Sequence, residues 1–231
     1  MQWYTELLFR PIFNALIVLY TMIPGRDLGL AIIAVTLLLR IILYPLNRKA
    51  IVSQKALQTV QPKIEELKER YKDDREKLSS AMMELYKKEG INPFSSCLPL
   101  LIQLPILIAV YQVFQSGIAS TSFDLLYSGV ANPGTLNTVA FGFLDLAKRS
   151  IPLAVLAGIA QYWQAKMMVA KRTAGASAAS AMNTQMLYLM PAFTIVIGSS
   201  FPAGLTLYWF ATTVFSGLQQ LIMLRKMKAK A

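Results

Sequence analysis

Long uncharged apolar runs alternate along the chain with short segments that hold most of its charge. A membrane-spanning helix needs roughly 20 mostly apolar residues, and four runs reach this length. The last of them, 173–224, is too long for one crossing, and we expect Phe201-Pro-Ala-Gly204 to turn the chain there, because proline stops a helix and glycine permits reversal. The pattern therefore predicts five spans, with their flanks at 26–46, 95–117, 150–170, 183–200 and 204–224.

The first 25 residues have a weaker pattern. Their apolar side chains fall near one helical face, whereas Arg10, Asn14 and Thr21 fall near another, and Pro24-Gly25 ends the segment. We interpret 1–25 as an amphipathic helix on the outer membrane surface. The alternative is a short sixth span with the N-terminus inside. No small-residue cleavage site follows, so we expect no cleavable signal peptide.

The segment 47–94 has the periodicity of a helix, but it is too polar to cross a membrane. Apolar residues recur every three or four positions on both sides of a polar break at Lys72-Asp73-Asp74, and Gly90 and Pro93 close the second run. The pattern predicts an antiparallel helical hairpin outside the membrane. The remaining connections are predicted as a loop at 118–149, a short flexible loop at 171–182 and a basic tail at 225–231.

Composition supports a bilayer as the solvent. The chain is 55% hydrophobic and 15% charged, whereas soluble domains average about 45–50% and 25%. We therefore assign it to the all-α class, as a polytopic membrane protein with a five-helix transmembrane core and a cytoplasmic helical hairpin. Most of the net charge of +11 lies in 45–94, 166–182 and the tail, which predicts that these regions are cytoplasmic, with the N-terminus out and the C-terminus in.

The chemistry of metals and general bases is poorly represented. The chain has one cysteine, Cys97, and no histidine, and it contains no phosphate-binding loop. We expect no catalytic residues, no metal and no cofactor, and we do not expect an enzyme. Most basic residues lie in the segments between the apolar runs, where they are explained by the orientation of the spans. We therefore also expect no sequence-specific nucleic-acid binding.

Arg40 is the one charge within the apolar part of a predicted span. An arginine at mid-span costs roughly 2.5–3.5 kcal/mol on insertion scales, and the apolar parts of the five spans contain no acidic partner. The side chain could snorkel to the head groups near Leu46, but we favour a water-filled cavity that opens to the cytoplasm. Thr36 lies one turn before Arg40, and Gln103 is one of several span glutamines that fit a wet interior.

Several motifs carry a family resemblance that extends from about residue 3 to 226. The chain resembles the YidC-type membrane protein insertases (the YidC/Oxa family) of bacteria, without the large extracytoplasmic domain that many Gram-negative members carry. The motifs are Thr36-x-x-x-Arg40, Tyr44-Pro45-Leu46, Gln61-Pro62-Lys63-Ile64, Asn92-Pro93, the run from Cys97 to Ile106 with Tyr111, Met190-Pro191, and Phe201-Pro-Ala-Gly204-Leu-x-Leu-Tyr208-Trp209.

The resemblance implies an insertase and chaperone of the bacterial cytoplasmic (inner) membrane that helps nascent membrane proteins to insert and fold. It implies a hydrophilic groove open to the cytoplasm and to lipid, with Arg40, Thr36, Tyr208 and Trp209 in it, to which we add Gln103. Thr213 stands where the family often has asparagine, so that site is not carried over.

We expect the hairpin, which resembles the first cytoplasmic loop of the family, to make the first contact with substrate or ribosome; the alternative is a solvated cap on the bundle. We take the candidate recognition residues of the hairpin to be Pro62, Lys63, Arg70 and Lys72. The expected partners are nascent membrane proteins and membrane lipid, with the Sec translocon and the ribosome as further candidates.

Two other classes remain as alternatives. A small anion transporter or channel could use Arg40 as its binding charge, although it would need a path through both leaflets and usually has an inverted repeat. A structural assembly subunit with a snorkelling Arg40 would tolerate the loss of that charge.

Overall fold

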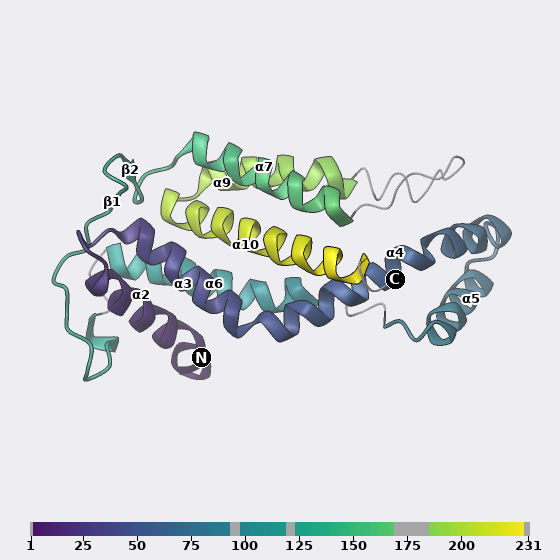
Figure 1. The fold of residues 1–231 in the computed structure, drawn as a ribbon, viewed down its shortest axis with the longest axis horizontal. Coiled ribbons are helices and arrows are strands. Elements are labelled where there is room, and N and C mark those ends of the chain that lie inside the picture. Colours follow the sequence, from purple (N-terminus) through teal and green to yellow (C-terminus); the bar gives the residue numbers. More distant parts are fainter. Residues whose placement is uncertain (1, 93–97, 119–122, 169–184, 229–231) are drawn as a thin grey trace.

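The computed structural model describes residues 2–92, 98–118, 123–168 and 185–228, and these are mostly helical (Figure 1). This confirms the all-α prediction. Between α6 and α7 lie a short helix, η3 (Phe123–Leu125), and an antiparallel pair of strands, β1 (Val139–Ala140) and β2 (Leu144–Asp145). The remaining helices are α1 (Gln2–Tyr4), η1 (Thr5–Phe9), α2 (Arg10–Met22), α3 (Leu28–Ile42), α4 (Tyr44–Arg70), α5 (Arg75–Lys88), α6 (Leu98–Ile118), α7 (Ile151–Met168), η4 (Gln185–Leu189), α9 (Met190–Ser200) and α10 (Ala203–Lys228).

Five helices form the core of the molecule: α3, α6, α7, α9 and α10. Helix α10 contacts α7 on one side and α3 on the other, while α9 packs on α7, and α2 packs on α3 and α6. In Figure 1 the strands lie at one end of this bundle, and the pair α4 and α5 extends from the opposite end, where the chain ends. We call these the loop end and the hairpin end.

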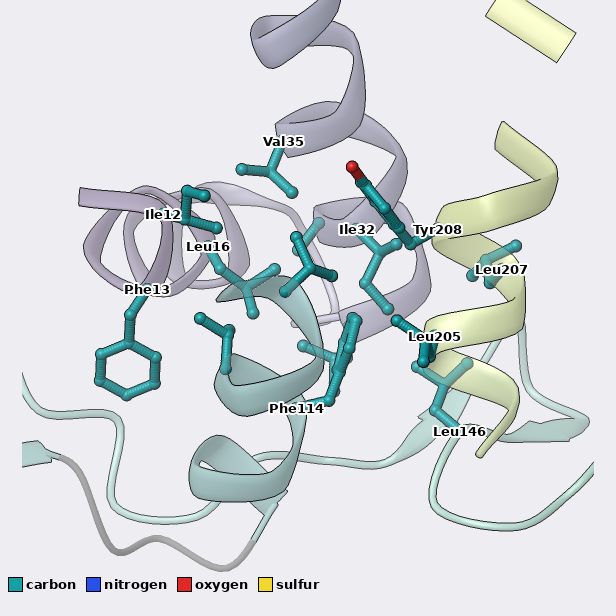
Figure 2. Packing of buried hydrophobic residues seen from close by; sticks show 14 of the residues in the cluster. Ile12, Phe13, Leu16, Ile32, Val35, Phe114, Leu146, Leu205, Leu207 and Tyr208 are labelled. Carbon is teal, nitrogen blue, oxygen red and sulfur yellow. The ribbon is translucent and has the colours of Figure 1, made fainter. Parts of the chain in front are cut away.

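The apolar core fills the loop end of the bundle. It is built from α2, α3, α6 and α10, with Leu146 of the connecting loop inserted between them (Figure 2). Phe13, Ile17, Leu28, Ile32 and Leu146 have no exposed surface. Between helices in a bilayer such side chains stabilise the structure mainly through van der Waals packing, and their complete burial shows that this half of the molecule is closely packed.

The outer surface of the bundle is apolar as well. Ile41, Ile151 and Val196, from three different core helices, are each more than three-fifths exposed, at 66%, 65% and 63%. Exposed large apolar side chains on all of these helices agree with lipid around the bundle. By length and composition alone, Thr5–Met22 qualifies as a span among the described residues, and α3 with α4 would qualify as a broken one, bent by 68°.

Helix α3 ends earlier than the hydropathy predicts. The apolar run continues to Leu46, but the helix stops at Ile42, and α4 begins at Tyr44 in a new direction. Pro45 explains the break because it has no amide hydrogen with which to continue the ladder of α3, whereas it fits the first turn of α4. The predicted span 26–46 therefore contains the end of α3, the break and the first turn of α4.

The predicted hairpin corresponds to α4 and α5. Asp74 caps α5 by accepting a hydrogen bond from the Lys77 amide at 3.0 Å, and Lys63 of α4 pairs with Glu89 at 2.6 Å. Pro62 lies inside a continuous 27-residue helix, where the exposed side of α4 accommodates its ring and its missing hydrogen bond.

The turn before α10 also differs from the prediction. Phe201 is extended and Ala203 already begins α10, so Gly204 lies inside the helix. A Cβ atom on Gly204 would lie 3.2 Å from the Phe114 ring, which shows that this glycine permits close packing rather than chain reversal. Helix α10 continues to Lys228, so the predicted tail is largely helical, while the predicted loop 171–182 lies outside the described residues.

The polar face of α2 is covered by polypeptide. Asn14 donates to the Leu125 carbonyl at 3.1 Å and accepts from the Tyr127 amide at 2.7 Å, and Arg10 donates to Leu125 at 3.0 Å. The opposite side packs into the apolar core through Phe13 and Leu16. The predicted amphipathic helix is thus integrated into the bundle, and its polar residues hold the connecting loop.

Candidate functional site

Arg40 joins two other helices through polar contacts at the edge of the apolar core. It lies in the last turn of α3 and is half-buried. One guanidinium nitrogen, Nη2, donates to Oε1 of Gln103 on α6 at 3.4 Å, and Nε2 of Gln103 donates to the hydroxyl of Tyr208 on α10 at 2.8 Å. We call this Arg40–Gln103–Tyr208 chain the polar bridge.

The two contacts differ in strength. The Gln103–Tyr208 bond has the length of an ordinary hydrogen bond, whereas 3.4 Å is long for a charged donor. The guanidinium has further donors, and Arg40 remains partly exposed. The bridge therefore fixes Gln103 and Tyr208 while it leaves most of the hydrogen-bonding capacity of Arg40 for water or another ligand.

The bridge borders the apolar core on its hairpin side. Val35, Ile106 and Tyr208 are among the last buried members of the core on α3, α6 and α10, with 3–6% of their surface exposed. Figure 2 shows the Tyr208 hydroxyl directed away from Phe114 and Leu146, which lie deeper toward the loop end. A polar site therefore adjoins a dry interior that continues to the loop end of the bundle.

Arg40 has no carboxylate partner in the described residues. All 12 acidic residues of the chain lie within them, yet α3, α6, α7, α9 and α10 contain none. Asp27 caps the opposite end of α3, where it accepts from the amides of Leu30 and Phe141 at 3.0 and 2.6 Å. A buried arginine without a counter-ion is costly, so its environment must supply water or a ligand.

Thr36 and Trp209 are not part of the bridge. The Thr36 hydroxyl is almost completely buried and donates to the Ile32 carbonyl of its own helix at 2.6 Å. Trp209 is half-buried. Since neighbouring residues of a helix point about 100° apart, Trp209 and Tyr208 face different directions. Of the predicted groove residues, the structure thus brings together Arg40, Gln103 and Tyr208.

The candidate recognition residues of the hairpin lie apart from the bridge. Pro62, Lys63, Arg70 and Lys72 are exposed, and α4 and α5 extend from the hairpin end in Figure 1. Lys63 is bound to Glu89, so its charge is partly neutralised. The other three are open to solvent.

One contact that the sequence did not indicate fixes the base of the hairpin. Gln58 of α4 donates through Nε2 to the carbonyl of Met168, the last residue of α7, at 3.2 Å, and Lys55 donates to the side chain of Gln58. This contact satisfies a free carbonyl at the C-terminus of α7, which a cation also favours. Its partners are 110 residues apart, so no local pattern could have indicated it.

Fold and site together define a class of protein, the polytopic helical membrane proteins with a five-helix core and a helical hairpin at one end. Against known proteins, residues 18–230 match the family described as 60Kd inner membrane protein. The chain belongs to this family.

Curated relatives agree over most of the chain. The "Membrane protein insertase YidC" of Clostridium tetani is 39% identical over 210 residues, which cover 90% of this chain and 86% of that protein. The protein of the same name from Fusobacterium nucleatum is 34% identical, with 87% of both chains covered. The Anaeromyxobacter protein of that name is 38% identical, but the match covers only 33% of its length.

A solved structure shows the same fold. The structure described as "Active YidC insertase crystal structure with the first transmembrane domain resolved" matches with a TM-score of 0.64 and 24% identity. The match covers 94% of this chain and 46% of the other, so this chain spans about half of that protein.

Proposed function

We propose that this protein is a membrane protein insertase, which moves the hydrophilic parts of nascent membrane proteins into the bilayer and helps their apolar segments to reach lipid. Two relatives that carry this name, from Clostridium tetani and Fusobacterium nucleatum, match it over 86% and 87% of their own length. The observation that carries the mechanism is Arg40, a half-buried cation that binds a neutral amide and has no acidic partner among the described residues.

In this mechanism, α3, α6 and α10 form a hydrated groove that begins at the hairpin end and stops at the apolar core. A polar backbone group that crosses dry hydrocarbon without a partner costs several kcal/mol. Water beside Arg40 shortens the dry distance, and the close packing around Ile32 and Phe114 prevents a continuous aqueous path. The partition of the substrate's apolar segment into lipid supplies the driving force.

The charge of Arg40 attracts acidic residues in the translocated part of the substrate. Two opposite charges 4 Å apart interact by about 1 kcal/mol in water and about 4 kcal/mol near a protein surface. The apolar segment of the substrate then moves along α3 and α10, past Tyr208 and Trp209, and enters lipid between them.

The hairpin end faces the cytoplasm in this proposal, with the N-terminus outside and the C-terminus inside. Positive charge supports that orientation, because the segments 45–94, 166–182 and 225–231 hold 18 of the 23 basic residues. Exposed Pro62, Arg70 and Lys72 are positioned to meet a nascent chain. Contact with a ribosome or a Sec translocon would use the same surface.

An anion transporter is less compatible with the observations. Such a protein needs a route through both leaflets, but the interior beyond Tyr208 is filled by buried apolar side chains such as Leu205 and Leu146. A snorkelling structural Arg40 would not need Gln103. The proposed function accounts for both features.

Replacement of Arg40 tests this function in a strain depleted of its own insertase. We expect Arg40→Lys to retain activity, because the site needs charge more than the fork of a guanidinium. Arg40→Glu should reduce the insertion of acidic-tailed substrates most, on the order of tenfold, with Arg40→Ala between them. Insertion is measured as protease protection of the translocated tail.

Arg75→Glu is the matched control, because it makes the same charge change on exposed α5. It should leave insertion near the unmodified level. If Arg40→Glu inserted acidic-tailed substrates as well as the unmodified protein does, the attraction mechanism would be wrong. If Arg40→Ala were fully active for all substrates, the structural-subunit alternative would replace the proposed function.

A further inference from the structure

The junction between α3 and α4 exposes an unusual combination of side chains. Ile41 and Ile42 are 66% and 62% exposed, and Tyr44 and Val52 are each 46% exposed, although all four are apolar or aromatic. Two exposed cations lie between them. We call this surface the elbow face and define it by Ile41, Ile42, Tyr44, Arg48, Lys49 and Val52.

The members from α4 lie on one side of that helix. Tyr44, Arg48 and Val52 are four residues apart and follow one another along the helix, and Lys49 lies beside Val52, three residues before it. The rest of this part of the helix is packed, since Ala50 and Ile51 are 3% and 9% exposed. The fold therefore presents these residues outward while it holds the helix behind them.

The two cations have no ion pair within the described part of the chain. Other basic residues there do pair with carboxylates, as Arg10 does with Glu6 and Lys148 with Asp145. No acidic residue occurs between Asp27 and Glu65. Arg48 and Lys49 thus form an exposed positive site whose complement must come from outside the chain.

The order of residues along the elbow face follows the layers of a membrane leaflet. Ile41 and Ile42 come first and suit hydrocarbon, Tyr44 suits the interface, and Arg48 and Lys49 suit the head-group layer. Gln219 donates to the Tyr44 carbonyl at 3.4 Å, which places the elbow beside the end of α10. The bend of 68° then directs α4 away from the line of α3.

We propose that the elbow face binds the head group of an anionic phospholipid, with Arg48 and Lys49 on the phosphate and Ile41 and Ile42 against the acyl chains. A guanidinium matches phosphate oxygens with two parallel hydrogen bonds, and an ammonium adds a point charge. Val52 continues the face with an apolar contact one turn further on. This site is separate from Arg40 and independent of any substrate.

Lipid binding to the purified full-length protein tests the proposal. In a neutral detergent, the protein is titrated with phosphatidylglycerol or with phosphatidylcholine of identical acyl chains, and bound lipid is counted by native mass spectrometry. We expect a clear preference for phosphatidylglycerol. In R48Q/K49Q its affinity should fall about tenfold or more, since each basic residue near a membrane surface contributes roughly fivefold.

K87Q/K88Q is the control, because it removes the same charge from exposed positions at the end of α5. It should keep the preference, and both variants should match the unmodified protein in thermal unfolding. Equal loss in both variants, or no preference in the unmodified protein, would overturn the proposal. So would displacement of the lipid by a tenfold excess of inorganic phosphate, which would indicate a site for free anions. Insertion activity does not enter this measurement, so its outcome is separate from that of the proposed function.

Discussion

At the scale of single residues, Gln103 holds a central position in the site. Its amide suits both neighbours, because the oxygen accepts from the Arg40 guanidinium while the nitrogen donates to the Tyr208 hydroxyl. Glutamate there would neutralise Arg40, and leucine would leave both polar groups without a partner. A neutral bridge thus orients the cation without removing its charge.

The coupling between Gln103 and Tyr208 is measurable. Because they share a hydrogen bond, the losses of unfolding free energy in Gln103→Leu and Tyr208→Phe should not add in the double variant. The interaction should be about 0.6 kcal/mol, which is typical of side-chain hydrogen bonds between membrane helices. Denaturant unfolding in detergent micelles of the two single variants and the double variant provides the number. Strict additivity would show that the bond contributes nothing.

At the scale of elements, helix α3 is defined at its start by a capping residue and at its end by a proline. Asp27 caps its start and binds the loop that carries β1, while Pro45 ends it and starts α4. Helix α4 is in turn held by the contact of Gln58 with α7. These contacts hold the base of the hairpin, from which its outer part extends away from the bundle (Figure 1).

The Lys63–Glu89 pair connects that outer part to α4. The adjacent ammonium of Lys63 holds the pKa of Glu89 below its usual value of 4.5. A lowered pKa means that the pair stabilises the hairpin fully above the usual value, and that this contribution is lost as the pH falls through the lower folded value.

Hydrogen exchange of α5 should therefore depend on Glu89 in a pH-dependent way. At neutral pH, Glu89→Gln should exchange a few-fold faster than the unmodified protein, because an exposed pair contributes little but measurably. The difference should disappear in acid, where Glu89 is itself protonated. Glu84→Gln, at an exposed position of α5, serves as the control. A difference that persists unchanged in acid would show that charge is not the cause.

At the scale of the whole molecule, the two ends of the bundle have opposite character. The loop end is closed by apolar packing, with Leu146 and Ala140 of the connecting loop completely buried. The hairpin end carries the polar bridge and the exposed cations. This asymmetry favours entry from one side only, which is what an insertase without an energy-consuming step requires.

Much of this organisation follows from the sequence, and the exceptions have physical causes. Hydropathy predicts the helical core, and the absence of acidic residues from the spans predicts an unpaired Arg40. Hydropathy does not show the elbow, because the apolar run continues to Leu46 past the break. The amphipathic pattern of α2 is the same whether water or polypeptide covers the polar face of the helix. The contact of Asn14 with the connecting loop could therefore not be predicted.

The polar bridge likewise could not be predicted from local sequence patterns. Gln103 was a groove candidate by its position in a span, but its partners lie 63 and 105 residues away. Only the packing of α3, α6 and α10 brings them together. Gly204 shows the same dependence, since its neighbour Phe114 belongs to another helix.

The most direct test of the central claim is photo-crosslinking to a stalled nascent chain with a single apolar segment. Crosslinkers are placed at Thr36, Tyr208 and Trp209, with Val196, exposed on the lipid side of α9, as the control. We predict adducts at Trp209 first, and at the buried Thr36 and Tyr208 once the chain has separated α3 from α10. Adducts at none of the three positions, or equally strong adducts at Val196, would contradict the account.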